Sequence, residues 1–377
     1  MENFSEGKAA VKMGRQWGFI DPAGQVEIPF NYIRVGNFRN GLAWYFDGSK
    51  YGFIDERGQV AITPQFDRAY DFESGVARVV RDGKFGLIDP KGQYVLKPKY
   101  SIIYPFEDNG LAKAGSGNEH ITYVLINQQG IQVTPQSFVE IRPFSDGLAA
   151  VKTRNGFGFI DATGRLVIPD RFLKVSNFHN GLASIQENGK CGYIGTDGQL
   201  RIDLVFSKCL DFEDGKAVVY QGYRKAGLID STGSFIILPS LDNLALFSEG
   251  KGIMRDDRYR FYYITEKLDA GSDYYQQARA YRHGIAVVQS NGHWGVINQN
   301  GMEIIPPKYD RIEHFENGYA KVRITGFSGL SNLKGELIVQ PDYEYISYAG
   351  QGLFRVEQGE KIGYFDLSGS WVWGLRE

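Results

Sequence analysis

The chain has 377 residues, a formal net charge of −2 and 42% apolar residues. This charge balance gives no long-range field to attract nucleic acid or an anionic membrane, and no apolar run approaches the roughly 18 residues of a membrane helix. Aromatic residues and glycine are abundant, with 23 Tyr, 25 Phe and 47 Gly, whereas Pro and Met number only 13 and 4. Such a composition favours many short strands joined by tight turns.

The ends and the cysteines bear on the cellular setting. The N-terminal residues are polar and already belong to the first repeat, so we expect no signal peptide in this chain. The two cysteines, Cys191 and Cys209, are too few for a disulfide framework and lack the spacing of zinc ligands. A reducing, cytoplasmic location is therefore the default expectation.

Four sequence marks recur in the same order along the whole chain, with a step of about 34 residues. In one copy they are the Phe-x-x-Gly-x-Ala segment from Phe144 to Ala149, the pair Phe157-Gly158, the pair Asp161 and Gly164, and the pair Pro169 and Phe172. The marks divide the chain into about eleven units, approximately 4–37, 38–71, 72–105, 106–143, 144–177, 178–211, 212–246, 247–280, 281–314, 315–348 and 349–377.

Each unit predicts three short strands. In the copy above they cover residues 148–152, 157–161 and 165–168. Asp161 suits the first position of a hairpin turn, where its oxygen accepts backbone hydrogen bonds, and Gly164 suits a last position with positive φ. Both faces of the small sheet carry apolar residues, so neighbouring units must cover them. No segment has a sustained period of 3.6 residues, and we expect almost no helix.

These residues give the chain a specific resemblance to the WG-repeat family, also called KWG repeats. The likeness is carried by segments such as Gly14–Asp21, His293–Asn298, Pro307–Asp310 and Phe315–Ala320. It spans the whole chain, although the name-giving Trp survives only at Trp17 and Trp294. The resemblance implies a β-hairpin repeat, found mostly in bacterial proteins, with no established enzymatic activity and no catalytic residues to carry over.

Two all-β arrangements of the units fit the sequence. Eleven units exceed the four to eight blades usual for one propeller, and no unit is visibly split between the two termini. We therefore expect an open superhelical, solenoid-like stack, with one or two propeller-like rings as the alternative. The ends of an open stack would lack polar caps, which makes self-association through them an expected property.

Enzymatic chemistry finds little support in the sequence. It contains no Gly-x-Ser-x-Gly, His-Glu-x-x-His or phosphate-loop motif. The Asp series at the turns resembles catalytic or calcium-binding carboxylates, but the Asn residues at 127, 298 and 332 could not act as acids or bases. His283 and His293 are close in sequence but lack further ligands for a metal. We expect no cofactor and no metal, and no enzyme activity.

One region departs from the repeat rules. The eighth unit loses the small Gly beside the aromatic residue, and its turn lacks the final Gly. Tyr and Arg, which are enriched at interface hot spots, accumulate there. The candidate partner-binding residues are Arg255, Arg258, Tyr259, Arg260, Tyr274, Tyr275, Arg279, Tyr281 and Arg282. The competing interpretation is decay of one copy, with Tyr filling core positions and Arg lying over them.

The function that follows is a non-catalytic scaffold that binds a protein or peptide along the repeat surface. The alternative is a carbohydrate-binding or cell-surface-binding accessory domain of a bacterial protein. Neither hypothesis involves nucleic acid or insertion into a membrane.

Overall fold

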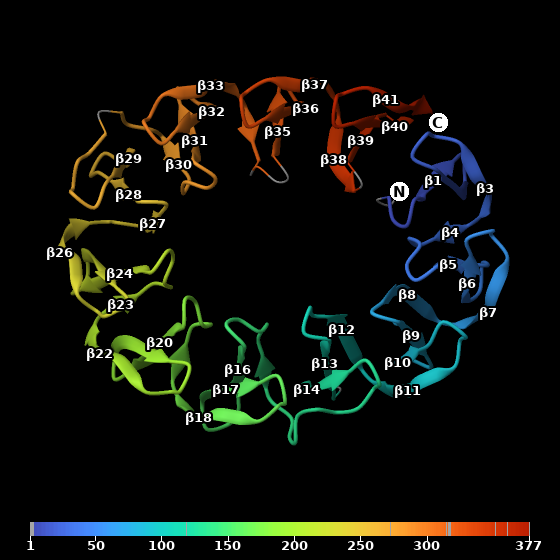
Figure 1. The fold of residues 1–377 in the computed structure, drawn as a ribbon, viewed down its shortest axis with the longest axis horizontal. Helices are drawn as coiled ribbons and strands as arrows, with labels where there is room; N and C mark the ends of the chain where they lie inside the picture. Colours follow the sequence, from blue (N-terminus) through green and yellow to red (C-terminus); the bar gives the residue numbers. More distant parts are fainter. Residues whose placement is uncertain are drawn as a thin grey trace. The chain divides into compact units, whose positions relative to one another are not determined.

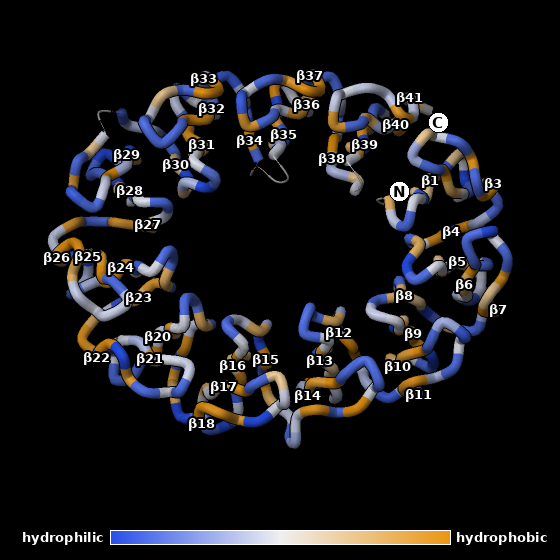
Figure 2. Tube along the Cα trace, in the orientation of Figure 1, coloured by the Kyte–Doolittle hydropathy of each residue, from blue (hydrophilic) through white to orange (hydrophobic). Residues whose placement is uncertain are grey.

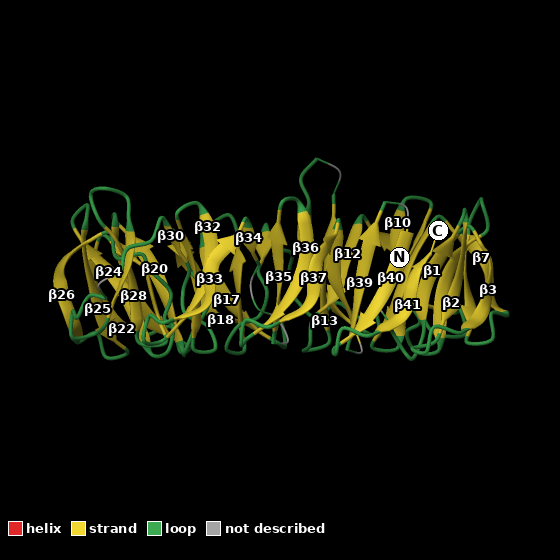
Figure 3. Cartoon of the chain, turned by 90° about the horizontal axis from the view of Figure 1, so that it is seen from above, coloured by secondary structure: helices red, strands yellow, loops and turns green. Residues whose placement is uncertain are grey.

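The structure is a computed structural model that describes residues 4–117, 119–271, 273–313, 315, 318–350, 352–359 and 361–376. None of these residues lies in a helix, and Figure 3 shows strands joined by loops throughout. The strands of the described ranges form eleven small antiparallel sheets, eight with four strands and three with three. Figure 2 shows hydrophobic strand segments alternating with hydrophilic turns along the chain. The all-β tandem repeat predicted from the sequence is confirmed.

The 34-residue units of the sequence are called repeats from here on. The chain also divides into two larger compact units. Unit 1 comprises Met1–Ser137, Gly326–Leu330 and Ile338–Glu377, and unit 2 comprises Phe138–Thr325 and Ser331–Leu337. The strands β36 (Phe327–Asn332) and β37 (Leu337–Tyr343) are divided between the units.

Unit 1 contains the first four sheets of the chain and the last one. Their strands are β1 (Ala9–Met13), β2 (Gln16–Ile20) and β3 (Val26–Tyr32); β4 (Arg34–Val35), β5 (Leu42–Phe46), β6 (Tyr51–Asp55) and β7 (Val60–Phe66); β8 (Arg68–Glu73), β9 (Val76–Arg81), β10 (Lys84–Ile88) and β11 (Tyr94–Tyr100); β12 (Ile102–Phe106), β13 (Leu111–Ser116) and β14 (Thr122–Asn127); and β38 (Tyr345–Gly350), β39 (Leu353–Gln358), β40 (Lys361–Asp366) and β41 (Trp371–Arg376).

Unit 2 contains the sheets of the middle of the chain. Their strands are β15 (Glu140–Ile141), β16 (Leu148–Lys152), β17 (Phe157–Asp161) and β18 (Leu166–Phe172); β19 (Lys174–Val175), β20 (Leu182–Glu187), β21 (Lys190–Gly195) and β22 (Leu200–Phe206); β23 (Lys208–Cys209), β24 (Lys216–Gln221), β25 (Lys225–Asp230) and β26 (Phe235–Asp242); β27 (Leu246–Ser248), β28 (Lys251–Arg255) and β29 (Phe261–Ile264); β30 (Gln277–Ala278), β31 (Ile285–Ser290), β32 (His293–Asn298) and β33 (Glu303–Tyr309); and β34 (Arg311–Ile312) and β35 (Tyr319–Ile324).

Most sheets have one strand more than the sequence predicted. The additional strand comes from the connector between successive repeats and pairs with the first predicted strand, as β15 pairs with β16 through Ile141 and Val151. In several sheets this strand has only two residues, as in β4, β15 and β19, which is too short for a recognisable alternation of apolar and polar positions.

The glycine beside the aromatic residue is explained by a bulge in the same sheet. Phe157 pairs with Phe172 and Phe159 with Ile168, so Gly158 alone faces the three residues between Ile168 and Phe172 on β18. A Cβ atom at Gly158 would lie 2.5 Å from the Ile168 carbonyl oxygen and 2.8 Å from the Asp170 amide nitrogen. The residue must therefore be glycine, because the strands approach too closely for any side chain.

The Asp and Asn residues at the hairpins are turn residues. The Asp161 Oδ1 accepts backbone hydrogen bonds from Thr163 at 2.9 Å and from Arg165 at 3.1 Å. The Asn298 Oδ1 accepts the equivalent bonds from Asn300 at 2.9 Å and Met302 at 3.0 Å. Asn therefore serves the turn as Asp does, which confirms the turn interpretation.

A repeated ring contact joins each of several sheets to the next repeat. An aromatic residue of the central strand meets the aromatic residue at the Phe position of the following Phe-x-x-Gly turn, in an edge-to-face or tilted arrangement. The ring centroids are 4.7 Å apart for Phe19 and Phe38, 5.1 Å for Phe53 and Phe72, 4.7 Å for Phe159 and Phe178, 4.8 Å for Tyr193 and Phe212, and 4.8 Å for Tyr263 and Tyr281.

Hydrogen bonds at the Phe-x-x-Gly turns reinforce this coupling. The Glu249 carboxylate accepts hydrogen bonds from the backbone amides of His283 at 2.7 Å and Gly284 at 2.9 Å, in the same turn of the next repeat. Glu249 in turn donates its own backbone N–H to Asp214 of the preceding repeat at 3.0 Å. In these two repeats the third residue of the turn thus caps the turn that follows.

The first and last sheets of the chain make the same contact with each other inside unit 1. The Phe4 ring lies 5.5 Å from that of Tyr364 in β40, and the Phe4 amide donates to the Ala349 carbonyl at 2.5 Å. One buried cluster includes Val11 and Ile20 from the first sheet and Tyr364 and Trp373 from the last. Figure 1 shows β1 beside β41 near the C-terminus.

This contact corrects the expected architecture. An open stack would leave the first and last sheets uncovered, but here each buries an apolar face of the other. The terminal sheets are therefore not uncovered, as the expected open superhelical stack required; they pack on each other, as the propeller-like alternative requires. Self-association stays a prediction.

The turn chemistry gives a first prediction. Asp161→Asn at neutral pH should shift the melting temperature by no more than about 2 °C, because the acceptor oxygen remains. Gly164, with φ of 77°, should not tolerate a β-branched residue, and Gly164→Val should cost about 1–2 kcal/mol. Thermal melts of the two variants measure this, and a large loss for Asn with none for Val would contradict the turn assignment.

Acidification provides a further measurement on the same pair. The hydrogen bond from the Thr163 hydroxyl holds the pKa of Asp161 below its usual value of 3.8. Stability from this carboxylate is complete above that value and is lost as the pH falls through the lower pKa of the folded state. Any difference in stability that favours the parent over Asp161→Asn should therefore become smaller below about pH 3.8.

The terminal contact gives a second prediction. Phe4→Ala should destabilise the protein by about 3–5 kcal/mol, as a cavity at a buried ring would, although the residue lies near the chain terminus. Phe38→Ala is the matched control at the same repeat position, where the ring is fully buried. Similar losses of unfolding free energy in chemical denaturation would support the packing of the terminal sheets. If Phe38→Ala lowered the unfolding free energy and Phe4→Ala did not, the terminal sheets would not pack on each other.

Candidate functional site

The segment predicted to bind a partner contains one exposed group in unit 2. Tyr259 is 71% exposed in the turn between β28 and β29, and the Arg255 guanidinium lies 5.1 Å from its ring centroid. Arg258 is also exposed. The Arg260 guanidinium forms an ion pair with Asp256 at 2.8 Å and lies 4.0 Å from the ring centroid of the half-exposed Tyr274.

The other predicted residues mostly serve the fold. Tyr281 is 2% exposed, occupies the Phe position of the next turn, and donates its hydroxyl to the Asn298 carbonyl at 2.9 Å. The Arg279 Nη1 donates to the Ile312 carbonyl at 3.0 Å, and its guanidinium lies 4.8 Å from the Trp294 ring centroid. Burial raises the pKa of Tyr281 and lowers the pKa of Arg279.

Tyr275 and Arg282 complete the set. Tyr275 exchanges two backbone hydrogen bonds with Phe261, both of 2.7 Å, and so replaces a strand pairing in this sheet. Arg282 lies in the following Phe-x-x-Gly turn and lines a small cavity of about 190 Å³ together with His283 and Phe315. The structure therefore does not gather the nine residues into one patch. Tyr275, Arg279 and Tyr281 build the core and the contacts between sheets, and Arg260 is partly exposed. The five exposed residues are Arg255, Arg258, Tyr259, Tyr274 and Arg282.

Larger hollows lie elsewhere, between one sheet and the next. The first, which we call the Trp44 groove, measures about 470 Å³ in unit 1 and is lined by residues that include Arg34, Trp44, Tyr51, Arg68, Tyr70 and Arg78. The second, the disulfide groove, measures about 360 Å³ in unit 2 and is lined by residues that include Lys174, Ser184, Cys191, Lys208, Cys209 and Asp211.

The two grooves occupy the same place in the repeat. Arg34, Trp44 and Tyr51 correspond in repeat position to Lys174, Ser184 and Cys191, and Arg68 corresponds to Lys208. Each groove is bordered by the two-residue first strand and the second strand of one sheet and by the first strand of the next. The two grooves therefore lie at the same position of the repeat but are lined by chemically different residues.

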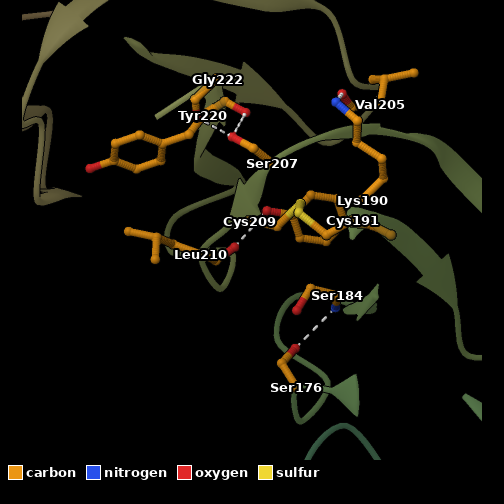
Figure 4. Close-up of a disulfide and its surroundings, with 11 residues drawn as sticks. Ser176, Ser184, Lys190, Cys191, Val205, Ser207, Cys209, Leu210, Tyr220 and Gly222 are labelled. Atoms are coloured by element: carbon orange, nitrogen blue, oxygen red, sulfur yellow. Dashed lines mark hydrogen bonds between the residues drawn. A yellow bond between two sulfur atoms is a disulfide. The ribbon is translucent and has the colours of Figure 1, made fainter. Parts of the chain in front are cut away.

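A disulfide that sequence analysis did not predict lies in the second groove (Figure 4). It joins Cys191 in β21 to Cys209 in β23, across 18 residues and between successive sheets. Phe157 and Val175 occupy the same two positions one repeat earlier and pack in one cluster. That spacing of 18 residues was the available signal, because the repeat places these two positions in contact.

The groove residues were missed for a related reason. Trp44, Arg78 and Ser184 each follow the Ala of the Phe-x-x-Gly-x-Ala mark, where Ala10 and Ala150 stand in other copies. Sequence reasoning concentrated on the positions that repeat, and the groove is lined by a position that varies. An alignment of the eleven repeats against one another would have singled it out.

Two other features bear on chemistry. In the part of the chain that the structure describes, no three His, Cys, Asp or Glu side chains gather as a metal site would require. No helix long and apolar enough to cross a membrane occurs among the described residues. His314 lies outside these residues.

The fold and the grooves define a class of protein: a tandem array of small antiparallel sheets with hollows between successive sheets. The family follows from sequence comparison. The WG containing repeat matches residues 17–51, 51–85, 85–118, 125–156, 157–191, 192–224, 294–326 and 329–361. The chain belongs to this family, and the resemblance to it is confirmed.

Other comparisons are distant. No curated protein matches the chain. Among solved structures it is similar to a eukaryotic initiation factor, with a TM-score of 0.47 and 12% identity over 78% of this chain and 95% of that one. It is also similar to dihydro-heme d1 dehydrogenase NirN, with a TM-score of 0.36 and 11% identity over 70% of this chain and 72% of that one. A third similar structure is BamB from Moraxella catarrhalis, with a TM-score of 0.29 and 10% identity over 85% of this chain and 92% of that one. These scores below 0.5 assign no function or ligand to the chain.

The division of the predicted segment into exposed and core residues gives a third prediction. Arg258→Ala combined with Tyr259→Ala should leave the melting temperature within about 2 °C of the parent, because both side chains are exposed. Tyr281→Ala should cost about 3–5 kcal/mol, since it removes a buried ring that joins two sheets. Equal destabilisation by the two variants would show that the exposed residues also belong to the core.

Proposed function

We propose that this protein is a non-catalytic scaffold that binds protein or peptide segments in the grooves between successive sheets. The observation that carries the proposal is the recurrence of a groove at one place in the repeat with different linings. A repeat that keeps its core and varies its groove suits the recognition of extended ligands, in which successive ligand side chains meet different pockets.

The exposed part of the eighth repeat is a second candidate surface for the same function. Arg255, Arg258 and Tyr259 are exposed and of the residue types enriched at interface centres. They form a projecting turn and not a hollow, so we place the principal binding in the grooves. The carbohydrate-binding alternative is retained because Trp44, Tyr51 and Tyr70 bring three aromatic rings to one groove.

Localisation stays a prediction. The sequence led us to expect a cytoplasmic setting, whereas a disulfide such as Cys191–Cys209 persists mainly in oxidising compartments. The disulfide therefore does not support the cytoplasmic location.

A peptide-display selection on the intact chain tests the proposed function, with a glycan array run in parallel. Enriched peptides, resynthesised and titrated calorimetrically, should bind the parent and lose about tenfold in affinity with Trp44→Ala, because about 1.4 kcal/mol of ring contact is removed. Tyr223→Ala is the control, since that ring is 93% exposed at a turn and should leave binding unchanged. Circular dichroism must show all variants folded.

Three outcomes would contradict the proposal. Loss of binding in the Arg258→Ala, Tyr259→Ala variant with none in Trp44→Ala would move the site to the eighth repeat. Enrichment of no peptide together with binding on the glycan array would favour the carbohydrate alternative. Turnover of a bound peptide or glycan would show that the protein is an enzyme.

A further inference from the structure

The Trp44 groove contains more positive charge than the protein around it neutralises. Its carboxylates are already engaged: Asp71 accepts hydrogen bonds from the Asn37 backbone at 3.2 Å and side chain at 3.3 Å, and Glu73 pairs with Arg78 at 3.3 Å. Arg34 and Arg68 are exposed at the groove and form no side-chain hydrogen bond or ion pair among the described residues. The groove therefore holds three guanidinium groups against two carboxylates, and within the described ranges the structure pairs neither Arg34 nor Arg68 with a carboxylate.

A third guanidinium lies at the base of this groove. Arg78 is only 9% exposed, and its Nη1 donates to the Ile103 carbonyl at 3.1 Å. Its Nε is buried and has no hydrogen-bond partner. The Arg78 guanidinium also lies 4.7 Å from the Tyr70 ring centroid. Arg78 thus adds positive charge beneath the groove, which its ion pair with Glu73 offsets in part.

The aromatic rings of the groove are partly covered by protein groups. Trp44 lies against the Gly36 backbone, where a Cβ atom would be 2.0 Å from its Nε1, and tilts against Tyr51 at 5.6 Å. Tyr70 stacks with Phe85 at 5.9 Å. A sugar-binding site needs a ring face for the pyranose to cover, and here Trp44 and Tyr51 pack on each other while Tyr70 contacts Phe85 and the Arg78 guanidinium. The lining is thus better suited to an anion than to a neutral sugar.

We propose that the Trp44 groove binds the carboxylate side chains of an acidic peptide, with Arg34 and Arg68 as the primary ligands and Arg78 beneath them. This inference rests on the proposed function and adds the class of ligand that one groove selects. The planar fork of each arginine matches a carboxylate through paired N–H donors. The net charge of −2 works against non-specific attraction of an acidic ligand, so binding must come from the local arrangement.

The disulfide groove provides an internal contrast. It carries Lys174 and Lys208 where the Trp44 groove carries Arg34 and Arg68, and Ser184 where the latter has Trp44. A lysine ammonium is a point charge on a flexible stem and cannot offer a paired fork. We therefore expect the two grooves to differ in their preference for carboxylates, although both contain two cations at the same repeat positions.

Fluorescence anisotropy with labelled octaglutamate tests this inference on the intact chain. Arg34→Gln with Arg68→Gln should weaken binding by about tenfold or more, because hydrogen bonds to charged groups are lost. Arg34→Lys with Arg68→Lys, which retains the charge, should recover only part of the affinity. The matched control, Lys174→Gln with Lys208→Gln, makes the same change in net charge and should leave octaglutamate binding near that of the parent.

The controls separate failure of this inference from failure of the proposed function. Equal binding of octaglutamine, or equal loss in the two Gln variants, would overturn the carboxylate site while leaving peptide binding intact. Peptides from the display selection that bind when octaglutamate does not would have the same consequence. Binding of trigalacturonate without octaglutamate would assign the arginines to an acidic sugar instead. If no peptide of any kind binds, the proposed function fails as well.

Discussion

The contact between a ring in one sheet and the Phe of the next Phe-x-x-Gly turn is the interaction on which the rest of this structure depends. A small sheet with apolar residues on both faces cannot bury them alone. The paired rings, with centroids about 5 Å apart, fix how one sheet meets the next. Because Phe4 and Tyr364 repeat that contact, the first sheet covers the last, and neither terminal sheet needs a separate cap.

The elements that repeat could be predicted from the sequence, and their details follow from local chemistry. The Asp161 turn and the role of Gly158 each depend on residues within about fifteen positions, so the pattern of one copy contains the cause. The packing of Phe4 on Tyr364 joins residues from opposite ends of the sequence. No periodicity records it, which is why an open stack was the expectation and the terminal contact was found only in the structure.

The candidate site shows the same division in another form. Departure from the common pattern in the eighth repeat drew attention to Tyr281 and Arg279, but the structure shows Tyr281 in the ordinary Phe position and Arg279 bonded to the Ile312 carbonyl. A chemically unusual residue at a core position is still a core residue. The groove residue Trp44 is unremarkable within its own copy, and only its comparison with Ala10 and Ala150 reveals it as variable.

Core and groove are therefore specified by different positions of one repeat, and this separation is what permits specialisation. The ring contact restricts the Phe position and the central strand, so changes there would disturb two sheets at once. The position occupied by Trp44, Arg78 or Ser184 borders a hollow between sheets. Substitution at that position changes the chemistry of one groove while the ring contacts beside it stay in place. A chain of eleven such repeats can thus diversify its surface one groove at a time, with Arg and Trp in one and a disulfide in another.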